Sequence, residues 1–137
     1  FSLLRDDSRE DTGLIRTILG IDDAAESLIL AGDMPQGSLV RLMHADTDSL
    51  VEGARSAAGD AGGTAPADTA TLMVSCVGRK IIMGSDVEEE VEAVAAAIGP
   101  QSAYAGFYSY GEIGPAAGGS CELHNQTMTI THIRESA

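Results

Sequence analysis

The sequence predicts an α+β domain, a largely antiparallel sheet of about six or seven strands packed with two main helices. Three observations carry this prediction: short alternating runs between turn-rich segments in the first third, two stretches with apolar residues at helical spacing, and an aromatic period-2 pattern near the end. A chain of 137 residues with 44% hydrophobic content suits one domain over residues 1–137.

The first third of the chain predicts four strands. Their apolar or alternating runs span residues 1–6, 14–21, 27–31 and 38–44. The segments that connect them, residues 6–13, 22–26 and 32–37, are acidic or contain Pro and Gly, as turns require. An antiparallel arrangement follows from such short connections.

A first helix follows these strands. Ser49 and Glu52 have the spacing of a capping box. The apolar face recurs at helical spacing and is mostly alanine: Leu50, Ala54, Ala57, Ala58 and Ala61. We therefore expect this helix to pack close to the sheet, and we interpret residues 59–68 as a linker without core-forming residues.

The middle of the chain predicts a buried strand and a second helix. Residues 71–77 form an apolar run that ends at Gly78-Arg79-Lys80, which places a charged tip at the end of a core strand. Ser85 and Glu88 form a second capping-box pattern. The expected buried stripe is Val87, Val91, Val94, Ala95 and Ile98. Gly99 and Pro100 end the helix.

The last third predicts a β-hairpin. Residues 103–113 alternate Tyr104, Gly106, Tyr108 and Tyr110 on one face, which is typical of a strand. Residues 114–120 are rich in Gly, Ala and Ser and form the connecting loop, and residues 121–133 resume with β-branched side chains.

Composition narrows the function classes. The net charge of −13 argues against nucleic acid and anionic membrane as partners, since both would repel the chain. No apolar run approaches the length of a membrane span and no basic-then-apolar leader opens the sequence, so we expect a cytoplasmic protein. Cys76 and Cys121 fit a reducing compartment, although one disulfide is possible.

Polar groups near the predicted core strands are the candidate ligand contacts. Arg79 would place a planar cation at a sheet edge, where it can grip a carboxylate; the alternatives are an internal ion pair with Glu112 or a surface position. Glu112 could receive an ammonium group opposite Arg79. Tyr108 and Tyr110 could form an aromatic wall, or they could simply cover a sheet face.

His124 and Asn125 add donors and acceptors on the last predicted strand. Alternation along a strand sends neighbouring side chains to opposite faces, so both can contact one ligand only across a bulge. A hydrogen-bonded structural histidine is the main alternative for His124. The spacing of Cys76, Cys121 and His124 matches no metal motif, so we expect no metal.

Catalysis and nucleotide binding are not expected. No nucleophile, base and orienting group have spacing support, so we expect the domain not to be an enzyme. The glycines at 114, 118 and 119 do not lead from a strand into a helix and therefore form no phosphate-binding loop.

The chain also resembles a known family, the C-terminal domain of FIST proteins (F-box and intracellular signal transduction). Three ordered motifs carry the resemblance, Ser75-Cys76-Val77-Gly78-Arg79, residues 106–113 (GFYSYGEI) and Leu123-His124-Asn125-Gln126-Thr127, with Gly20-Ile21-Asp22 and Pro35-Gln36-Gly37 also similar. The resemblance extends over the whole chain.

The resemblance implies an intracellular sensory domain of a signal-transduction protein, with amino acids as proposed ligands. It also implies a preceding FIST N-terminal domain from which this chain is cut, and a histidine kinase or other signalling protein as a further partner. The candidate ligand-binding residues are Arg79, Tyr108, Tyr110, Glu112, His124 and Asn125.

Two other functions are open at this point. One is a protein-interaction module that binds no ligand. The other is a haem-binding nitric-oxide sensor with His124, His44 or His132 as the axial ligand, and haem is then the one cofactor to consider.

Overall fold

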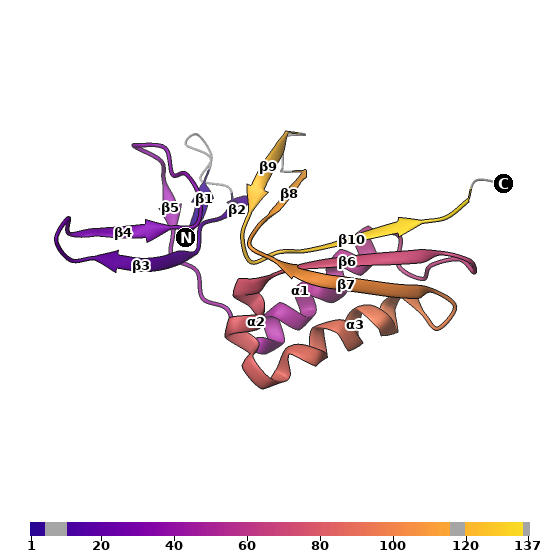
Figure 1. Ribbon diagram of the computed structural model, residues 1–137. Coiled ribbons are helices and arrows are strands. Elements are labelled where there is room, and N and C mark those ends of the chain that lie inside the picture. The colour runs from indigo at the N-terminus through magenta and orange to yellow at the C-terminus, as the bar shows by residue number, and fades with distance from the viewer. Residues whose placement is uncertain (5–10, 116–119, 136–137) are drawn as a thin grey trace. The chain divides into compact units, whose positions relative to one another are not determined.

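A computed structural model describes residues 1–4, 11–115 and 120–135 of the chain (Figure 1). The predicted strand at 1–6, its following turn and the predicted loop at 114–120 extend partly outside these described residues. The chain divides into two compact units: residues 1–44 with 113–126, and residues 45–112 with 127–137.

The first unit consists of short strands. β1 (Ser2–Leu4) lies between β2 (Asp11–Ile15) and β5 (Val40–Arg41) and is antiparallel to both. β3 (Ile18–Asp22) and β4 (Ser27–Leu30) form an antiparallel pair, as do the chain segments at β8 (Glu112–Pro115) and β9 (Cys121–His124) in a second two-stranded sheet. The strands predicted at 1–6, 27–31 and 38–44 are present in shorter form, but the strand predicted at 14–21 is divided between β2 and β3, which belong to different sheets.

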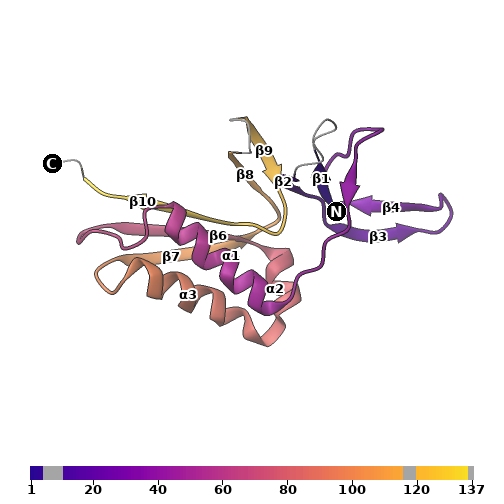
Figure 2. The ribbon, with the colours of Figure 1, turned by 180° about the vertical axis from the view of Figure 1, so that it is seen from behind.

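The second unit consists of a three-stranded sheet with helices on one face. β6 (Ala70–Cys76) is the central strand, with β10 (Met128–Ile133) antiparallel on one side and β7 (Ala103–Ser109) parallel on the other. α1 (Thr47–Asp60) and α3 (Glu88–Ile98) lie on the same face of this sheet, as both ribbon views show (Figures 1 and 2). α2 (Val77–Met83) and a 3-10 turn at Gly84–Val87 lead into α3.

The core of the second unit lies between the sheet and the two helices. Its buried residues are Ala54, Ala58, Ala65, Met73, Val94, Ile98 and Met128. The fully buried alanines of α1 let this helix approach α3 closely. α1 also contacts β10 of the sheet, the kind of neighbour that the alanine face predicted. Burial of this apolar area is the main stabilising contribution to the unit.

The predicted α+β class is confirmed, but the strands do not form one large sheet. The described strands form four separate sheets of three, three, two and two strands. β3 and β4 are exposed along nearly their whole length, so neither presents a buried face that would join them to a larger sheet.

The predicted hairpin between residues 103–113 and 121–133 is wrong. β7 pairs with β6 in parallel, with Gly106 opposite Met73 and Tyr108 opposite Ser75, while β10 pairs with the other edge of β6. The helical segment from 77 to 98 is the crossover that a parallel pair requires. The short predicted loop instead connects β8 and β9.

The helix boundaries also differ in detail from the prediction. The N-cap of α1 is Asp46, which exchanges hydrogen bonds with Ser49 in a capping box three residues earlier than expected. Ser85 does not cap α3, since its hydroxyl donates to Asp86 and the α3 N-terminus follows the 3-10 turn directly. Gly99, at φ 83°, ends α3 as predicted.

The predicted linker at residues 59–68 contributes to the core. Ala65 is buried, and its N–H donates to the carbonyl of Ile98 at 2.9 Å. The alanine inside this Gly-rich segment therefore fixes it against the end of α3, a long-range contact that local composition does not reveal.

Candidate functional site

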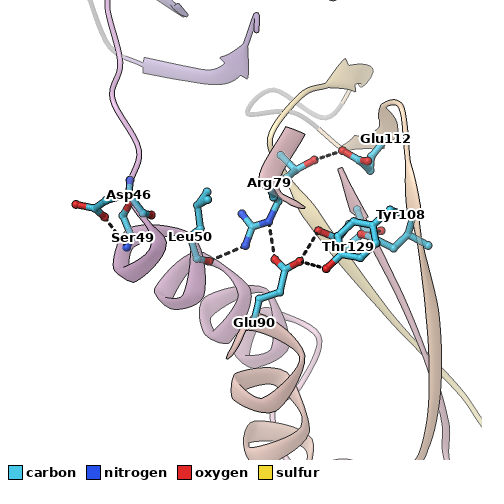
Figure 3. Close-up of polar contacts among 11 residues, drawn as sticks. Asp46, Ser49, Leu50, Arg79, Glu90, Tyr108, Glu112 and Thr129 are labelled. Carbon is cyan, nitrogen blue, oxygen red and sulfur yellow. Dashed lines mark hydrogen bonds and ion pairs between the residues drawn. The ribbon is translucent and has the colours of Figure 1, made fainter. Parts of the chain in front are cut away.

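A buried ion pair lies at the centre of the second unit (Figure 3). Arg79 Nε donates to Glu90 Oε2 at 2.9 Å, and the two side chains are 4% and 0% exposed. Arg79 Nη2 also donates to the carbonyl of Leu50 at 2.6 Å, so the guanidinium links α2 to both α1 and α3. Removing such a pair from water is expensive, and only a fully hydrogen-bonded arrangement offsets the cost.

The second carboxylate oxygen of Glu90 completes this arrangement. Glu90 Oε1 accepts hydrogen bonds from the Ser75 hydroxyl at 3.0 Å and from the Tyr108 hydroxyl at 2.7 Å. Ser75 and Tyr108 are opposite each other on β6 and β7, so the parallel register presents both hydroxyls to α3. One cation and two hydroxyls therefore hold Glu90. We call the four residues Glu90, Arg79, Ser75 and Tyr108 the Glu90 network.

The Glu90 network perturbs Tyr108. Burial raises the pKa of Tyr108 far above its ordinary value, the hydrogen bond to Glu90 and the charge of Glu90 raise it further, and the charge of Arg79 opposes them. The Lys80 ammonium lies over the Tyr108 ring, 5.1 Å from its centre, an arrangement typical of a cation–π interaction.

We expect the raised pKa of Tyr108 to make the protein lose stability in alkali. The unfolded chain releases the phenol proton near pH 10, about its ordinary pKa, while the folded chain retains it. The contribution of Tyr108 is therefore complete below about pH 10 and is lost as pH rises toward the folded pKa. Urea unfolding measures the free energy of unfolding at about pH 9 and at about pH 11. This free energy should fall less between the two pH values in Tyr108→Phe than in the parent protein, because the variant keeps the ring and has no phenol to titrate. An equal fall in both proteins would contradict this expectation.

A groove adjoins the Glu90 network. It has a volume of about 260 Å³ and lies between α3 and the β6–β7 part of the sheet. Its lining residues are Met73, Ser75, Val91, Met128 and the β7 residues 104–108. Most of the lining is apolar or aromatic, and Ser75 and Tyr108 belong to both the groove and the network. The groove is thus an apolar site with one polar end, the usual character of a small-molecule site.

Glu112 belongs to a separate polar contact in the same unit. Its two carboxylate oxygens accept hydrogen bonds from the hydroxyls of Ser109 and Thr127, the latter at 2.7 Å. Glu112 is buried, and the ion pair that the structure shows for Arg79 is with Glu90. Tyr110, by contrast, is 93% exposed just beyond the end of β7.

His124 and Asn125 lie in the first unit. His124 Nε2 is within 3.2 Å of the carbonyl oxygen of Gly114, on the neighbouring β8. Asn125 is buried; its amide oxygen accepts from the N–H of Thr17 at 3.2 Å, and its amide nitrogen donates to the carbonyl of His124. Both side chains therefore pair backbone groups inside this unit, and a ligand role for them stays a prediction.

The haem alternative concerns three histidines. His132 Nδ1 is 2.9 Å from the Thr71 hydroxyl in the second unit, His44 is exposed, and His124 contacts Gly114 as described above. An axial-ligand role for any of them stays a prediction that an absorbance scan with haemin tests. Cys76 is buried, Cys121 is exposed, and both are free thiols.

Sequence reasoning missed two buried charged residues. Glu90 lies within the acidic run 88–90, yet it precedes Val94 and Ile98 at four-residue intervals and shares their buried face; this spacing was the available signal. Arg16, in the first unit, is buried and donates to the carbonyls of Ile15, Asp33 and Leu123. No local pattern marks Arg16, because its partners come from distant parts of the chain.

The described residues contain neither a metal-binding cluster nor a membrane-spanning helix. In residues 1–4, 11–115 and 120–135, no three His, Cys, Asp or Glu side chains gather in a way that could hold a metal ion. No helix in the described part of the chain has the length and apolar character needed to cross a membrane.

The second unit combines α/β packing with an apolar groove beside a buried polar network. The chain belongs to the FIST C domain family, whose profile matches residues 2–115. Members of this family are sensory domains of signal transduction. The matched range includes the motifs at 75–79 and 106–113, while the third motif, at 123–127, follows it. Neither the characterised proteins nor the solved structures compared with the chain give a match.

Proposed function

We propose that this FIST C domain is a sensory module that binds a small molecule in the groove beside the Glu90 network. The observation that supports this proposal is the combination of an apolar lining with two fixed hydroxyls, on Ser75 and Tyr108, at one end of the groove. An apolar body with a single polar group is the ligand shape that such a groove favours.

The direction of the hydroxyl hydrogens specifies the polar group of the ligand. Ser75 and Tyr108 both donate to Glu90, so their oxygens keep lone pairs that can accept hydrogen bonds from a ligand. The carboxylate of Glu90 behind them favours a positively charged donor such as an ammonium group. A small amino acid with an apolar side chain fits these requirements, with its side chain against Met73, Val91 and Met128.

Lys80 is the cation that we assign to the carboxylate of such a ligand. Its ammonium stands over the ring of Tyr108 and is exposed, whereas Arg79 is 3% exposed and paired with Glu90. Arg79 then acts as a positioning residue, because it holds the carboxylate that orients both hydroxyls. This assignment moves the carboxylate contact expected of Arg79 to its neighbour in sequence.

We also propose that the groove binds its ligand without converting it. Glu90, the carboxylate nearest the groove, is occupied by one cation and two hydroxyls. Tyr108 keeps its proton at neutral pH, as any tyrosine does, and its raised pKa makes loss of that proton still less favourable. Neither group is therefore available as a general base, which must be able to take a proton near the working pH.

A thermal-shift screen with the common amino acids tests the proposal. A ligand at about a hundred times its Kd stabilises the folded protein by roughly 2.7 kcal/mol, which raises Tm by several degrees. We expect leucine or methionine to produce this shift and aspartate to produce none. Val91→Trp fills the groove and should abolish the shift, while Val51→Trp, on α1 outside the groove, should leave it intact. Equal shifts in both variants would refute the groove as the site.

An interaction role is the second candidate function, and one observation favours it. The sheet face opposite the helices exposes large apolar side chains, including Phe107 at 59% and Ile133 at 58%. The resemblance makes a FIST N-terminal domain of the same protein, or a histidine kinase or other signalling protein, the partner to test. Silence in the amino-acid screen, together with loss of partner retention in Ile133→Ser, which lies outside the groove, would favour this role over ligand binding.

A further inference from the structure

A second pocket in the second unit has a different chemical character. It has a volume of about 220 Å³, several times the roughly 30 Å³ that one water occupies. It is formed by the segment that follows α1 and by the end of β10, and its lining residues are Ala61, Gly62, Thr64, Pro66, Thr69, His132 and Arg134. None of these residues lines the groove beside the Glu90 network.

Two lining residues have buried polar atoms with no protein partner among the described residues. The Thr69 hydroxyl oxygen and His132 Nε2 are both buried and unpaired, and Thr69 as a whole is 2% exposed. A buried polar group without a hydrogen bond costs about 1–3 kcal/mol. Two such groups in the lining of one pocket indicate that a polar ligand, rather than an apolar one, is the complement of this pocket.

A chain of hydrogen bonds connects the other nitrogen of His132 to Ser102. The Ser102 hydroxyl lies within donating distance of two backbone carbonyls, of Thr69 at 3.1 Å and of Ala103 at 3.3 Å, so we assign the Thr71 hydroxyl, 2.8 Å away, as the donor to Ser102. In this assignment the Thr71 hydroxyl has used its only hydrogen and accepts from His132 Nδ1, at 2.9 Å. We accordingly assign the proton of the His132 ring to Nδ1, which makes Nε2 an acceptor.

Arg134 supplies a positive charge to the pocket. The segment after α1 reduces the partial negative charge at the C-terminal end of that helix. The carbonyls of Ala57, Ala58 and Gly59, at the C-terminal end of α1, are already hydrogen-bonded by the N–H groups of residues 61–63. The negative end of the α1 dipole is thereby partly neutralised. The pocket thus offers a guanidinium donor, a hydroxyl and an imidazole acceptor.

We propose that this pocket binds a phosphate group that retains one acidic hydrogen. The P–OH donates to His132 Nε2, and the remaining oxygens accept from Arg134 and from the Thr69 hydroxyl. Phosphate near neutral pH carries both a donor and anionic acceptors, whereas sulfate has the same shape and no hydrogen to donate. The site is separate from the proposed groove, so it stands or falls independently of the amino-acid proposal.

Titration calorimetry of the whole chain with sodium phosphate and with sodium sulfate, at about pH 7 and matched ionic strength, tests the proposal. We expect phosphate to bind and sulfate to bind at least about tenfold more weakly, since sulfate leaves Nε2 facing an anionic oxygen. Methyl phosphate tests the donated hydrogen, because near pH 7 it is mainly a dianion without a P–OH. It should therefore also bind at least about tenfold more weakly than phosphate, and equal affinity would contradict the hydrogen bond to Nε2.

Variants give the matched controls. Thr69→Val is isosteric, removes the unpaired hydroxyl and should weaken phosphate binding about tenfold while the fold stays stable. Arg134→Gln should weaken it by a similar factor, and Arg55→Gln, an exposed cation on α1, should not. Absence of phosphate binding, equal binding of phosphate and sulfate, or unchanged binding in Thr69→Val and Arg134→Gln would each overturn the proposal.

Discussion

Arg79→Met should lower the free energy of unfolding by about 3–5 kcal/mol, because it leaves the carboxylate of Glu90 buried without its cation. Methionine keeps most of the volume of the arginine stem, so the loss reports the charge and its hydrogen bonds rather than a cavity. The Leu50 carbonyl also loses its donor. Urea unfolding monitored by circular dichroism measures the effect, with the slope of the transition as a check on two-state behaviour.

The double variant Arg79→Met with Glu90→Gln separates the pair from its surroundings. Glutamine is neutral and its amide oxygen can still accept from Ser75 and Tyr108, so no unpaired charge remains. We expect the double variant to be more stable than either single variant. Arg55→Met breaks the exposed pair with Glu52 and should cost less than about 1 kcal/mol. A double variant as unstable as Arg79→Met would mean that the pair contributes by something other than mutual neutralisation.

The same double variant distinguishes two roles for Arg79. If Arg79 only holds Glu90 in place, the double variant should respond to an apolar amino acid in the thermal-shift screen as Glu90→Gln alone does, because both lack the carboxylate charge and both keep an acceptor for Ser75 and Tyr108. If Arg79 itself grips the ligand carboxylate, the response should disappear in the double variant. Lys80→Met should show the opposite behaviour. Its response to the amino acid should be lost if Arg79 only holds Glu90, and kept if Arg79 itself grips the ligand carboxylate.

The two main helices were predictable because their signals are local. Leu50, Ala54 and Ala58 recur at the helical period and are buried in α1. Val94 and Ile98 do the same in α3, and Gly99 marks its end. The short helix α2 was not predicted, and neither predicted N-cap was right, because Asp46 caps α1 in place of Ser49 and Ser85 does not cap α3.

The pairing of strands was less predictable because it depends on distant residues. The segment 103–109 was recognised as a strand, but its partner is β6, which precedes it by a helical crossover, and not the following strand. Short loops favour sequential hairpins, which is why the nearer partner was predicted. The register that places Tyr108 beside Ser75 is likewise a long-range feature.

The candidate site was predictable only in part, because some of its residues have local signals and others depend on distant partners. Arg79 and Tyr108 were selected by their positions, and the structure brings both to one carboxylate. That carboxylate, Glu90, was hidden in a run of three glutamates that would ordinarily face solvent. Thr69 was not selected, and His132 was named only as a possible haem ligand, since an unpaired buried atom becomes visible only when the surrounding chain is in place.

Gly106→Ala should destabilise the second unit by about 1–3 kcal/mol or more, although alanine ordinarily suits a strand interior better than glycine. A Cβ at Gly106 would overlap the carbonyl oxygen of Met73 and lie 3.0 Å from its Cβ. Because the obstacle is backbone of the central strand, it cannot turn aside as a side chain could. β7 would have to move away from β6, at the position where Gly106 and Met73 are opposite each other.

Gly59→Ala is the matched control for this prediction. A Cβ there meets no atom within 4 Å among the residues that the structure describes, and α1 is helical at that position. We therefore expect Gly59→Ala to stabilise the protein by about 0.5–1 kcal/mol. Gly106 also lines the groove, so Gly106→Ala should reduce the response to an amino acid even below the unfolding transition, whereas Gly59→Ala should preserve it. A Gly106→Ala protein as stable as the parent would show that β7 can separate from β6 at little cost. The groove wall formed by β7 would then not be rigid, and its shape could not select the ligand.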